Sequence, residues 1–170
     1  AMAVSLMLED AFSTNVVAAF TGDEEEDSNG AADVAEFFRK LHKKIKVIVL
    51  DVTDMGGREG CAFTIENNFW SDTTGKIVSR LSSQTGVLWK FVPSDPYEIP
   101  AYIPNGYMIR QEAEPDESWE YDEHEVECFS VCIPTKGDMH SDDGVFVRKD
   151  SLAPYMKILS LLCSEVQGII

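Results

Sequence analysis

Apolar side chains recur at helical spacing in four stretches of the chain. The clearest helix is predicted over residues 33–45, where the apolar positions fall on the single stripe of an amphipathic helix. They are Val34, Phe37, Phe38, Leu41 and Ile45. Further helices are predicted over residues 4–20, 73–85 and 151–166, and Gly22 ends the first of them.

Other stretches have the spacing of strands. Residues 46–54 form a nearly continuous β-branched run, which is typical of a central strand. Strands are also predicted over 60–65, 87–92, 125–133 and 145–147. Alternation within 125–133 puts Cys128, Ser130 and Cys132 on one face and Phe129, Val131 and Ile133 on the other. Asn105-Gly106 predicts a hairpin between 101–103 and 107–109.

The order of these elements is helix, helix, several strands, helix, without regular βαβ alternation. We therefore expect an α+β fold with a largely antiparallel sheet and helices packed on one face, with N-terminal helices and a C-terminal helix. The expected division is an N-terminal helical segment, 1–22, and a single α+β domain, 23–170, with acidic loops at 23–30 and 112–124. The C-terminal helix has a wide apolar face, which predicts a homodimer through it.

The composition and net charge of the chain exclude several classes of protein. The chain has 170 residues, of which 30 are acidic and 14 basic, so its formal net charge is −16, and 44% of its residues are hydrophobic. This excludes a disordered chain, a membrane-spanning protein and a basic nucleic-acid binder. We expect no direct contact with nucleic acid and none with membranes. Four thinly spread cysteines and no secretory signal favour reduced thiols in the cytoplasm.

Acidic residues are densest between 112 and 127, where no Lys or Arg occurs but two large aromatic rings do. Carboxylates can steer a basic protein surface into contact while the rings anchor it. We therefore expect a non-enzymatic protein-interaction module; the alternative is that both rings fold back onto the core. The predicted partner-binding residues are Glu112, Glu114, Asp116, Glu117, Trp119, Glu120, Tyr121, Asp122 and Glu123.

Spaced carboxylates can also imitate the phosphates of nucleic acid. An alternative function is therefore a nucleic-acid mimic that inhibits a DNA- or RNA-binding enzyme, so that its partner is a nucleic-acid-binding protein. The basic stretch from Arg39 to Lys46 would interrupt a continuous acidic stripe.

The first acidic cluster partly fits a calcium-binding loop. Its ligands would be Glu25, Asp27, Asn29, Asp33 and Glu36, with Gly30 at the sharp turn. The first position is Glu where Asp is usual, and Gly22 interrupts the entering helix. An acidic loop leading into a helix is therefore the preferred interpretation.

A further alternative is a Cys/His-dependent enzyme or metal site. His124, Cys128 and Cys132 would share one strand face at even spacing. A zinc site would need further ligands, and no second matching Cys pair is present. Buried, inert thiols are the preferred interpretation, and the sequence predicts no catalytic residue and no cofactor.

Overall fold

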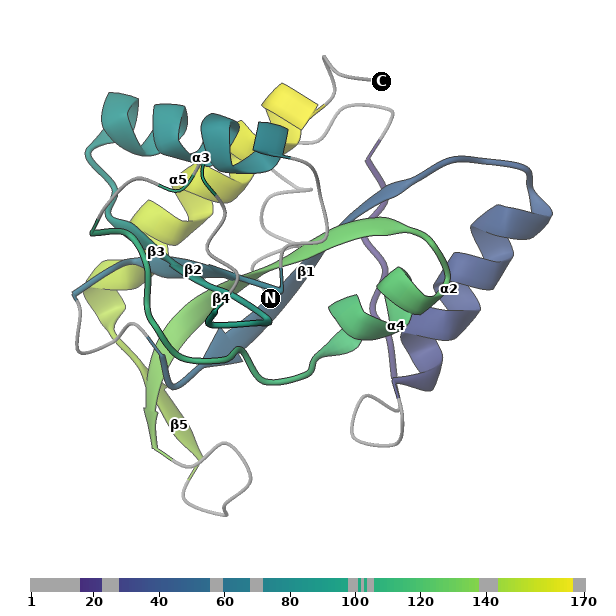
Figure 1. The fold of residues 1–170 in the computed structure, drawn as a ribbon, viewed down its shortest axis with the longest axis horizontal. Coiled ribbons are helices and arrows are strands. Elements are labelled where there is room, and N and C mark those ends of the chain that lie inside the picture. The colour runs from purple at the N-terminus through teal and green to yellow at the C-terminus, as the bar shows by residue number, and fades with distance from the viewer. Residues whose placement is uncertain are drawn as a thin grey trace.

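The computed structural model describes residues 16–22, 28–55, 60–67, 72–97, 101, 103, 106–137 and 144–166 (Figure 1). Their helices and strands are α2 (Asn29–Lys40), β1 (Lys46–Thr53), β2 (Phe63–Glu66), α3 (Asp72–Thr85), β3 (Trp89–Val92), α4 (Glu117–Glu123), β4 (Glu127–Gly137), β5 (Val145–Val147) and α5 (Lys149–Val166). Most predicted elements are confirmed in place, and α4 is the helix that the sequence did not predict. No helix in the described part of the chain has the length and apolar content to cross a bilayer.

The strands form one mixed sheet in the order β1-β4-β2-β3, and β5 pairs with the end of β4. β1 runs parallel to β4 over eight residue pairs, and β2 runs parallel to β3 over four. The β2–β4 and β4–β5 contacts are antiparallel, with three pairs each. The fold is α+β as predicted, but the largely antiparallel sheet is wrong. The helix α3 connects β2 to β3, and such a crossover is what parallel neighbours require.

Strand β1 lies at the end of this order, and β4 lies at its centre. The prediction of a central strand over 46–54 is therefore wrong about its neighbours. Its apolar run has another cause: Val49 is buried on one face, while Ile48 and Val52 pack against the core on the other. A continuous apolar run shows that both faces of a strand are covered, which does not depend on how many strands flank it.

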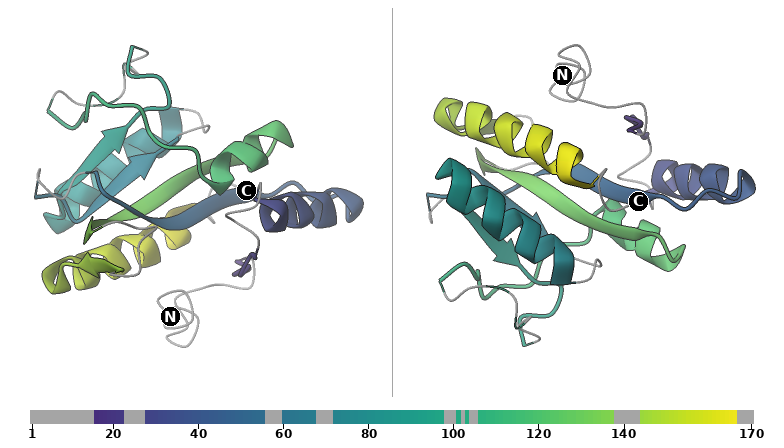
Figure 2. Two further views of the ribbon diagram at one scale, coloured as in Figure 1. Left: turned by 90° about the horizontal axis from the view of Figure 1, so that it is seen from below. Right: turned by 90° about the horizontal axis from the view of Figure 1, so that it is seen from above.

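Helices cover both faces of the sheet, so the prediction that they share one face is wrong. Figure 2 shows α3 and α5 side by side on one face and α4 on the other. The first face holds the main core, in which Phe129, Val131 and Ile133 of β4 meet Leu81 of α3 and Tyr155 of α5. On the second face, α2 and α4 pack beside Val49 and Cys128 in a smaller cluster.

The wide apolar face of α5 is accounted for within the fold. Ile158, Leu159 and Leu162 are buried in the main core, and Leu161 packs against that core while partly buried. Because the sheet and α3 cover this helix, the width of its stripe no longer requires a second subunit.

Two further predictions concern the helix over residues 4–20 and the hairpin over residues 101–109. Residues 16–22 have no regular secondary structure, and the rest of the helix predicted over 4–20 lies outside the described residues. Met108 forms a parallel bridge with Phe91 of β3, and neighbouring backbone groups bond to Phe91 on both sides. Residues 107–109 therefore extend the sheet beyond β3, whereas Tyr102, Pro104 and Asn105 of the predicted hairpin lie outside the described residues.

Candidate functional site

The acidic segment 112–127 contains the helix α4 where the sequence predicted a loop over 112–124. Asp116 is the N-cap of the helix: its backbone is extended, and its Oδ1 accepts a hydrogen bond from the Ser118 backbone nitrogen at 2.8 Å. Glu117 and Glu120 lie in the first turn, where carboxylates interact favourably with the helix dipole. Asp116, Glu117 and Glu120 give the segment the composition of a solvated loop. In the structure these three carboxylates stabilise the start of a helix.

Asp116 joins this helix to the sheet beneath it. Its Oδ1 also accepts a hydrogen bond from the Ser118 hydroxyl, and its Oδ2 accepts one from the hydroxyl of Ser130 on β4. Asp116 is half-buried, unlike most carboxylates of the segment. The structure therefore gives this predicted partner-binding residue a positioning role, in which it fixes α4 on the sheet.

Of the two predicted aromatic anchors, the structure places Tyr121 in the core. Its side chain is 4% exposed and packs with Ala31 and Ala35 of α2 and with Cys128 of β4. Burial, with the charge of Glu117 adding, raises the pKa of Tyr121 to about 12. The tyrosine holds α4 in place, so it is not available as a surface anchor in the folded protein.

Trp119 remains at the surface and is 39% exposed. We use the name α4 surface for Trp119 and the carboxylates of this segment that keep solvent contact. These carboxylates are Glu112, Glu114, Glu117, Glu120, Asp122, Glu123, Glu125 and Glu127.

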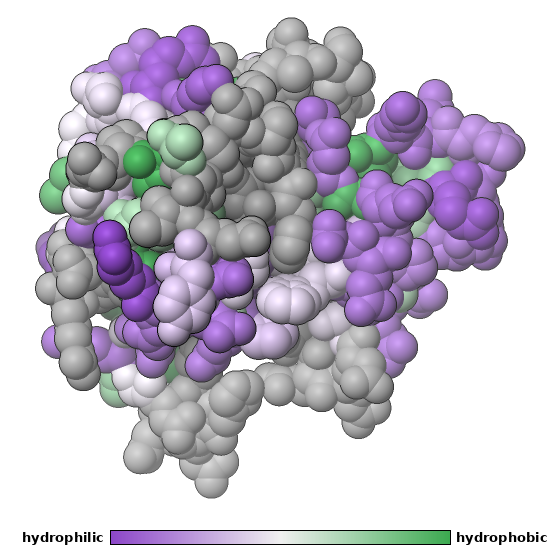
Figure 3. Space-filling model, in the orientation of Figure 1, coloured by the Kyte–Doolittle hydropathy of each residue, from purple (hydrophilic) through white to green (hydrophobic). Residues whose placement is uncertain are grey.

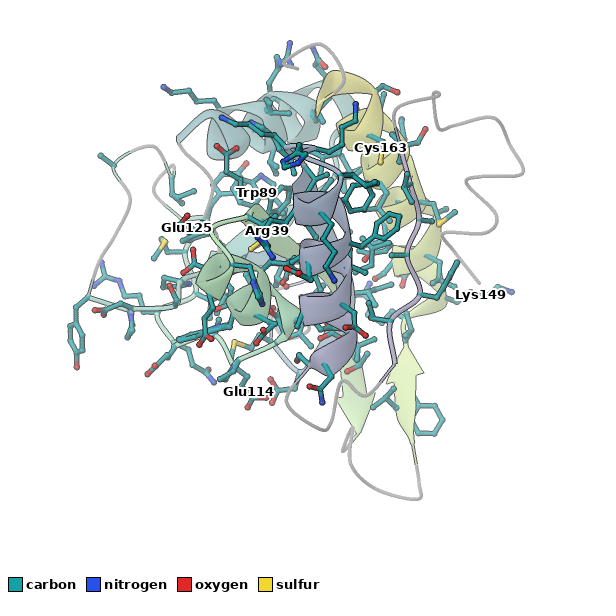
Figure 4. All side chains as sticks on the ribbon, turned by 90° about the vertical axis from the view of Figure 1, so that its right-hand side faces the viewer. Arg39, Trp89, Glu114, Glu125, Lys149 and Cys163 are labelled. Carbon is teal, nitrogen blue, oxygen red and sulfur yellow. The ribbon has the colours of Figure 1, made fainter. Side chains whose placement is uncertain are left out.

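Two basic side chains lie against carboxylates of the α4 surface. His124 Nε2 lies 3.1 Å from Glu120 Oε1, and Lys46 Nζ lies 2.8 Å from Glu127 Oε2. The surface over α2 and α4 is mostly hydrophilic (Figure 3). Glu114 and Glu125 lie on the α4 side of this end of the molecule, next to α2 (Figure 4). The arrangement is an ordered helix that presents one indole ring among many carboxylates.

A buried carboxyl lies on the sheet face beneath this segment. Glu66 of β2 is 4% exposed, and its Oε1 accepts a hydrogen bond from Thr64 Oγ1 at 2.5 Å. Burial raises the pKa of Glu66 to about 7; nearby Asp116 and Asp51 add to the rise, although hydrogen bonds oppose it. Near neutral pH this carboxyl therefore exists in both protonated and ionised forms.

The sequence does not reveal the burial of Glu66, because Thr64 and Glu66 alternate with Phe63 and Ile65, which is the pattern of a strand with one face in water. The pairing of β2 with β4 sets Glu66 opposite Ser130, and the acidic segment covers both residues. No feature of the sequence predicts that the acidic segment packs over these two residues.

Only part of the predicted calcium-binding loop lies within the described residues. Glu25 and Asp27 lie outside the described residues, and Asn29 already begins α2. Glu36 pairs with Arg39 at 2.6 Å and with Lys40 at 3.3 Å, and the Arg39 hydrogen bond contributes most to lowering its pKa to about 2. Asp33 is exposed. Among the described residues, no three His, Cys, Asp or Glu side chains are grouped as metal ligands.

The predicted Cys/His face is not formed. His124 follows α4 as its C-cap and contacts Glu120, because β4 begins only at Glu127. Cys128 donates from its Sγ to the Ser118 carbonyl at 3.0 Å, and burial raises its pKa to about 12. Burial also raises the pKa of Cys132 well above its usual range. These thiols stay protonated at neutral pH, which makes them poor nucleophiles.

Comparison of the chain with protein-family models, curated proteins and solved structures finds no match. The function is therefore inferred from the geometry of the α4 surface. The predicted partner-binding residues that keep solvent contact are Trp119, Glu112, Glu114, Glu117, Glu120, Asp122 and Glu123.

Proposed function

We propose that this chain is a non-enzymatic interaction protein whose α4 surface binds a basic protein partner. The observation that carries the proposal is the half-exposed indole of Trp119 on an ordered helix rich in solvent-exposed carboxylates. Interface hot spots are enriched in tryptophan, particularly where the ring can be fully desolvated by the partner. The carboxylates supply long-range attraction to cations, and the ring supplies the buried contact.

The position of α4 supports this function because three contacts hold the helix against β4 and α2. Tyr121 packs into the cluster with α2, Asp116 bonds to Ser130 of β4, and Cys128 donates to the Ser118 carbonyl. A surface that is already ordered loses less conformational entropy when a partner binds. The net charge of −16 accelerates encounter with cationic partners and slows encounter with anionic ones.

The proposal is tested with a labelled helical peptide of Lys and Leu, a matched Glu/Leu peptide and a Lys/Ser peptide, by fluorescence anisotropy. We expect the Lys/Leu peptide to bind the α4 surface most tightly, the Lys/Ser peptide to bind it more weakly and the Glu/Leu peptide not to bind this surface. Affinity for the Lys/Leu peptide should fall about tenfold or more between about 0.05 M and about 0.5 M salt, because the attraction is screened.

Two variants separate the α4 surface from the overall charge. E114Q/E123Q removes two carboxylates of the α4 surface, whereas D54N/D95N removes two exposed carboxylates outside it. We expect only the first variant to weaken binding, and W119S to weaken it by about tenfold. Equal effects of both double variants, or no binding of the Lys/Leu peptide at low salt, would overturn the proposal.

A further inference from the structure

The apolar stripe of α2 is only partly used by the fold. Such a stripe normally faces the core, but the residues of this helix that are buried are the small Ala31 and Ala35. They let α2 approach Tyr121, and Val34 packs against the same cluster while Phe38 is partly buried. Phe37 is 57% exposed and Leu41 is 52% exposed.

Cations surround this exposed stripe. We use the name α2 patch for the exposed residues Phe37, Arg39, Lys40, Leu41, Lys43 and Lys44. The single carboxylate of Glu36 pairs with both Arg39 and Lys40 and offsets only one of their two charges, so the patch with Lys43 and Lys44 stays positive. In a chain with a net charge of −16, the patch combines apolar groups with the opposite sign of charge.

We infer that the α2 patch docks on the α4 surface of a second copy of this chain. This inference rests on the proposed function, because it names the partner of that same surface. The two surfaces are complementary in charge, with lysines on one and carboxylates on the other. Each also carries exposed apolar groups, Phe37 and Leu41 on the α2 patch and Trp119 on the α4 surface.

The fold allows both contacts of such a dimer to form together. α2 and α4 pack against each other and lie side by side at one end of the molecule (Figure 4). A two-fold axis across this end would set α2 of each copy against α4 of the other, so that one operation creates two equal contacts. Stable interfaces bury about 1,200–2,000 Å² in total, which favours two reciprocal contacts over a single helix end.

Other anionic partners suit the α2 patch less well. Nucleic acid and acidic membranes present extended negative surfaces, which would also face the remaining carboxylates of this protein. A second copy instead presents its negative charge locally, at the α4 surface. Screening over about 8–10 Å at moderate salt lets this local attraction outweigh the repulsion between the distant parts of two acidic chains.

A charge exchange tests the inference, with analytical ultracentrifugation at moderate salt as the measurement. K43E/K44E reverses the α2 patch, and E114K/E123K reverses part of the α4 surface. We expect the wild-type protein to dimerise, and each variant alone to dimerise at least tenfold more weakly, since like charges then meet. An equimolar mixture of the two variants should dimerise as the wild type does, because both contacts are again between opposite charges.

K136E/K157E is the matched control, because it reverses two exposed lysines on β4 and α5 and should leave dimerisation unchanged. F37S/L41S should weaken the dimer with no change in charge. All the altered residues are exposed in the structure, and circular dichroism checks that every variant is folded. Dimers that survive in both charge variants, or a mixture that stays monomeric, would overturn the inference.

The Lys/Leu peptide distinguishes this failure from failure of the proposed function. A wild-type protein that stays monomeric but binds the peptide would overturn the second-copy inference and leave the proposed function standing. Binding of the Glu/Leu peptide by that monomer, lost in K43E/K44E, would assign the α2 patch to a different acidic partner. A monomer that binds no peptide would overturn both proposals.

Discussion

Ser130, in the middle of the central strand β4, donates a hydrogen bond from its Oγ to Oδ2 of Asp116, the N-cap of α4. The other oxygen of the same carboxylate caps the helix through Ser118. One side chain therefore performs two tasks: it starts the acidic helix and fixes that helix to the sheet. The orientation of Trp119 depends on both tasks, because α4 carries the ring.

Replacement of Asp116 by Ala should destabilise the protein by about 2–4 kcal/mol. The variant loses an N-cap, which costs about 1 kcal/mol, and leaves the buried Ser130 hydroxyl without this acceptor, which costs about 1–3 kcal/mol. The free energy of unfolding is measured by urea denaturation. E112A, which removes an exposed carboxylate of the same segment, should change it by less than about 0.5 kcal/mol. Equal losses in the two variants would contradict the role given to Asp116.

Glu66 should make the protein less stable as the pH rises. The folded-state pKa of Glu66 is about 7 and its ordinary value is 4.5, so the folded protein binds this proton more tightly than the unfolded chain does. The stabilisation is complete below pH 4.5 and is lost as the pH rises towards 7 and above it. The loss amounts to about 3 kcal/mol, at 1.4 kcal/mol for each pH unit.

Glu66→Gln removes this titration, and urea denaturation from pH 5 to pH 9 measures the effect. We expect the variant to gain stability relative to the wild type as the pH rises, with the largest difference near pH 8–9. D54N, which removes an exposed carboxylate, should follow the wild type at every pH. A constant difference between Glu66→Gln and the wild type would show that Glu66 does not titrate in this range.

The spacing of hydrophobic residues predicted the helices and strands well, because this spacing follows from backbone geometry and from burial within each segment. The helices α3 and α5 and the strands β1, β3 and β5 lie where periodicity puts them. Strand pairing was not predictable in the same way. Lys46 and Glu127 are register partners although about 80 residues separate them, and no local pattern encodes such a contact.

The candidate site was predictable in composition and not in geometry. Pattern and charge identified the acidic segment and its rings, but a single sequence does not tell a buried Tyr121 from a half-exposed Trp119 two residues away. The signal for α4 was present in Asp116 as a cap with Glu117 and Glu120 behind it. The exposure of Phe37 could not be predicted from the sequence, because it depends on how closely Ala31 and Ala35 let α2 approach its neighbours.

Thiol modification should separate the cysteines by burial. Cys61, Cys128 and Cys132 are buried, whereas Cys163 is only partly covered. Burial raises the pKa of Cys163 as well, so a thiol reagent at pH 8 should modify it first but slowly. Cys128 and Cys132 should react only when the protein unfolds. Mass spectrometry of the modified peptides over time measures the order, and rapid modification of Cys128 in the folded protein would contradict it.

Collisional quenching of Trp119 reports the charge around its ring. A cationic quencher such as caesium concentrates near carboxylates and iodide is repelled, so caesium should quench Trp119 about twofold or more better, relative to their effects on free tryptophan. The contribution of Trp119 is obtained as the difference between wild type and W119F, because the chain also contains Trp70 and the buried Trp89. E114Q/E123Q should lower the caesium preference and D54N/D95N should not. Equal quenching by the two ions would mean that the indole lies outside the field of the carboxylates, and the α4 surface would then lack the combination on which its binding depends.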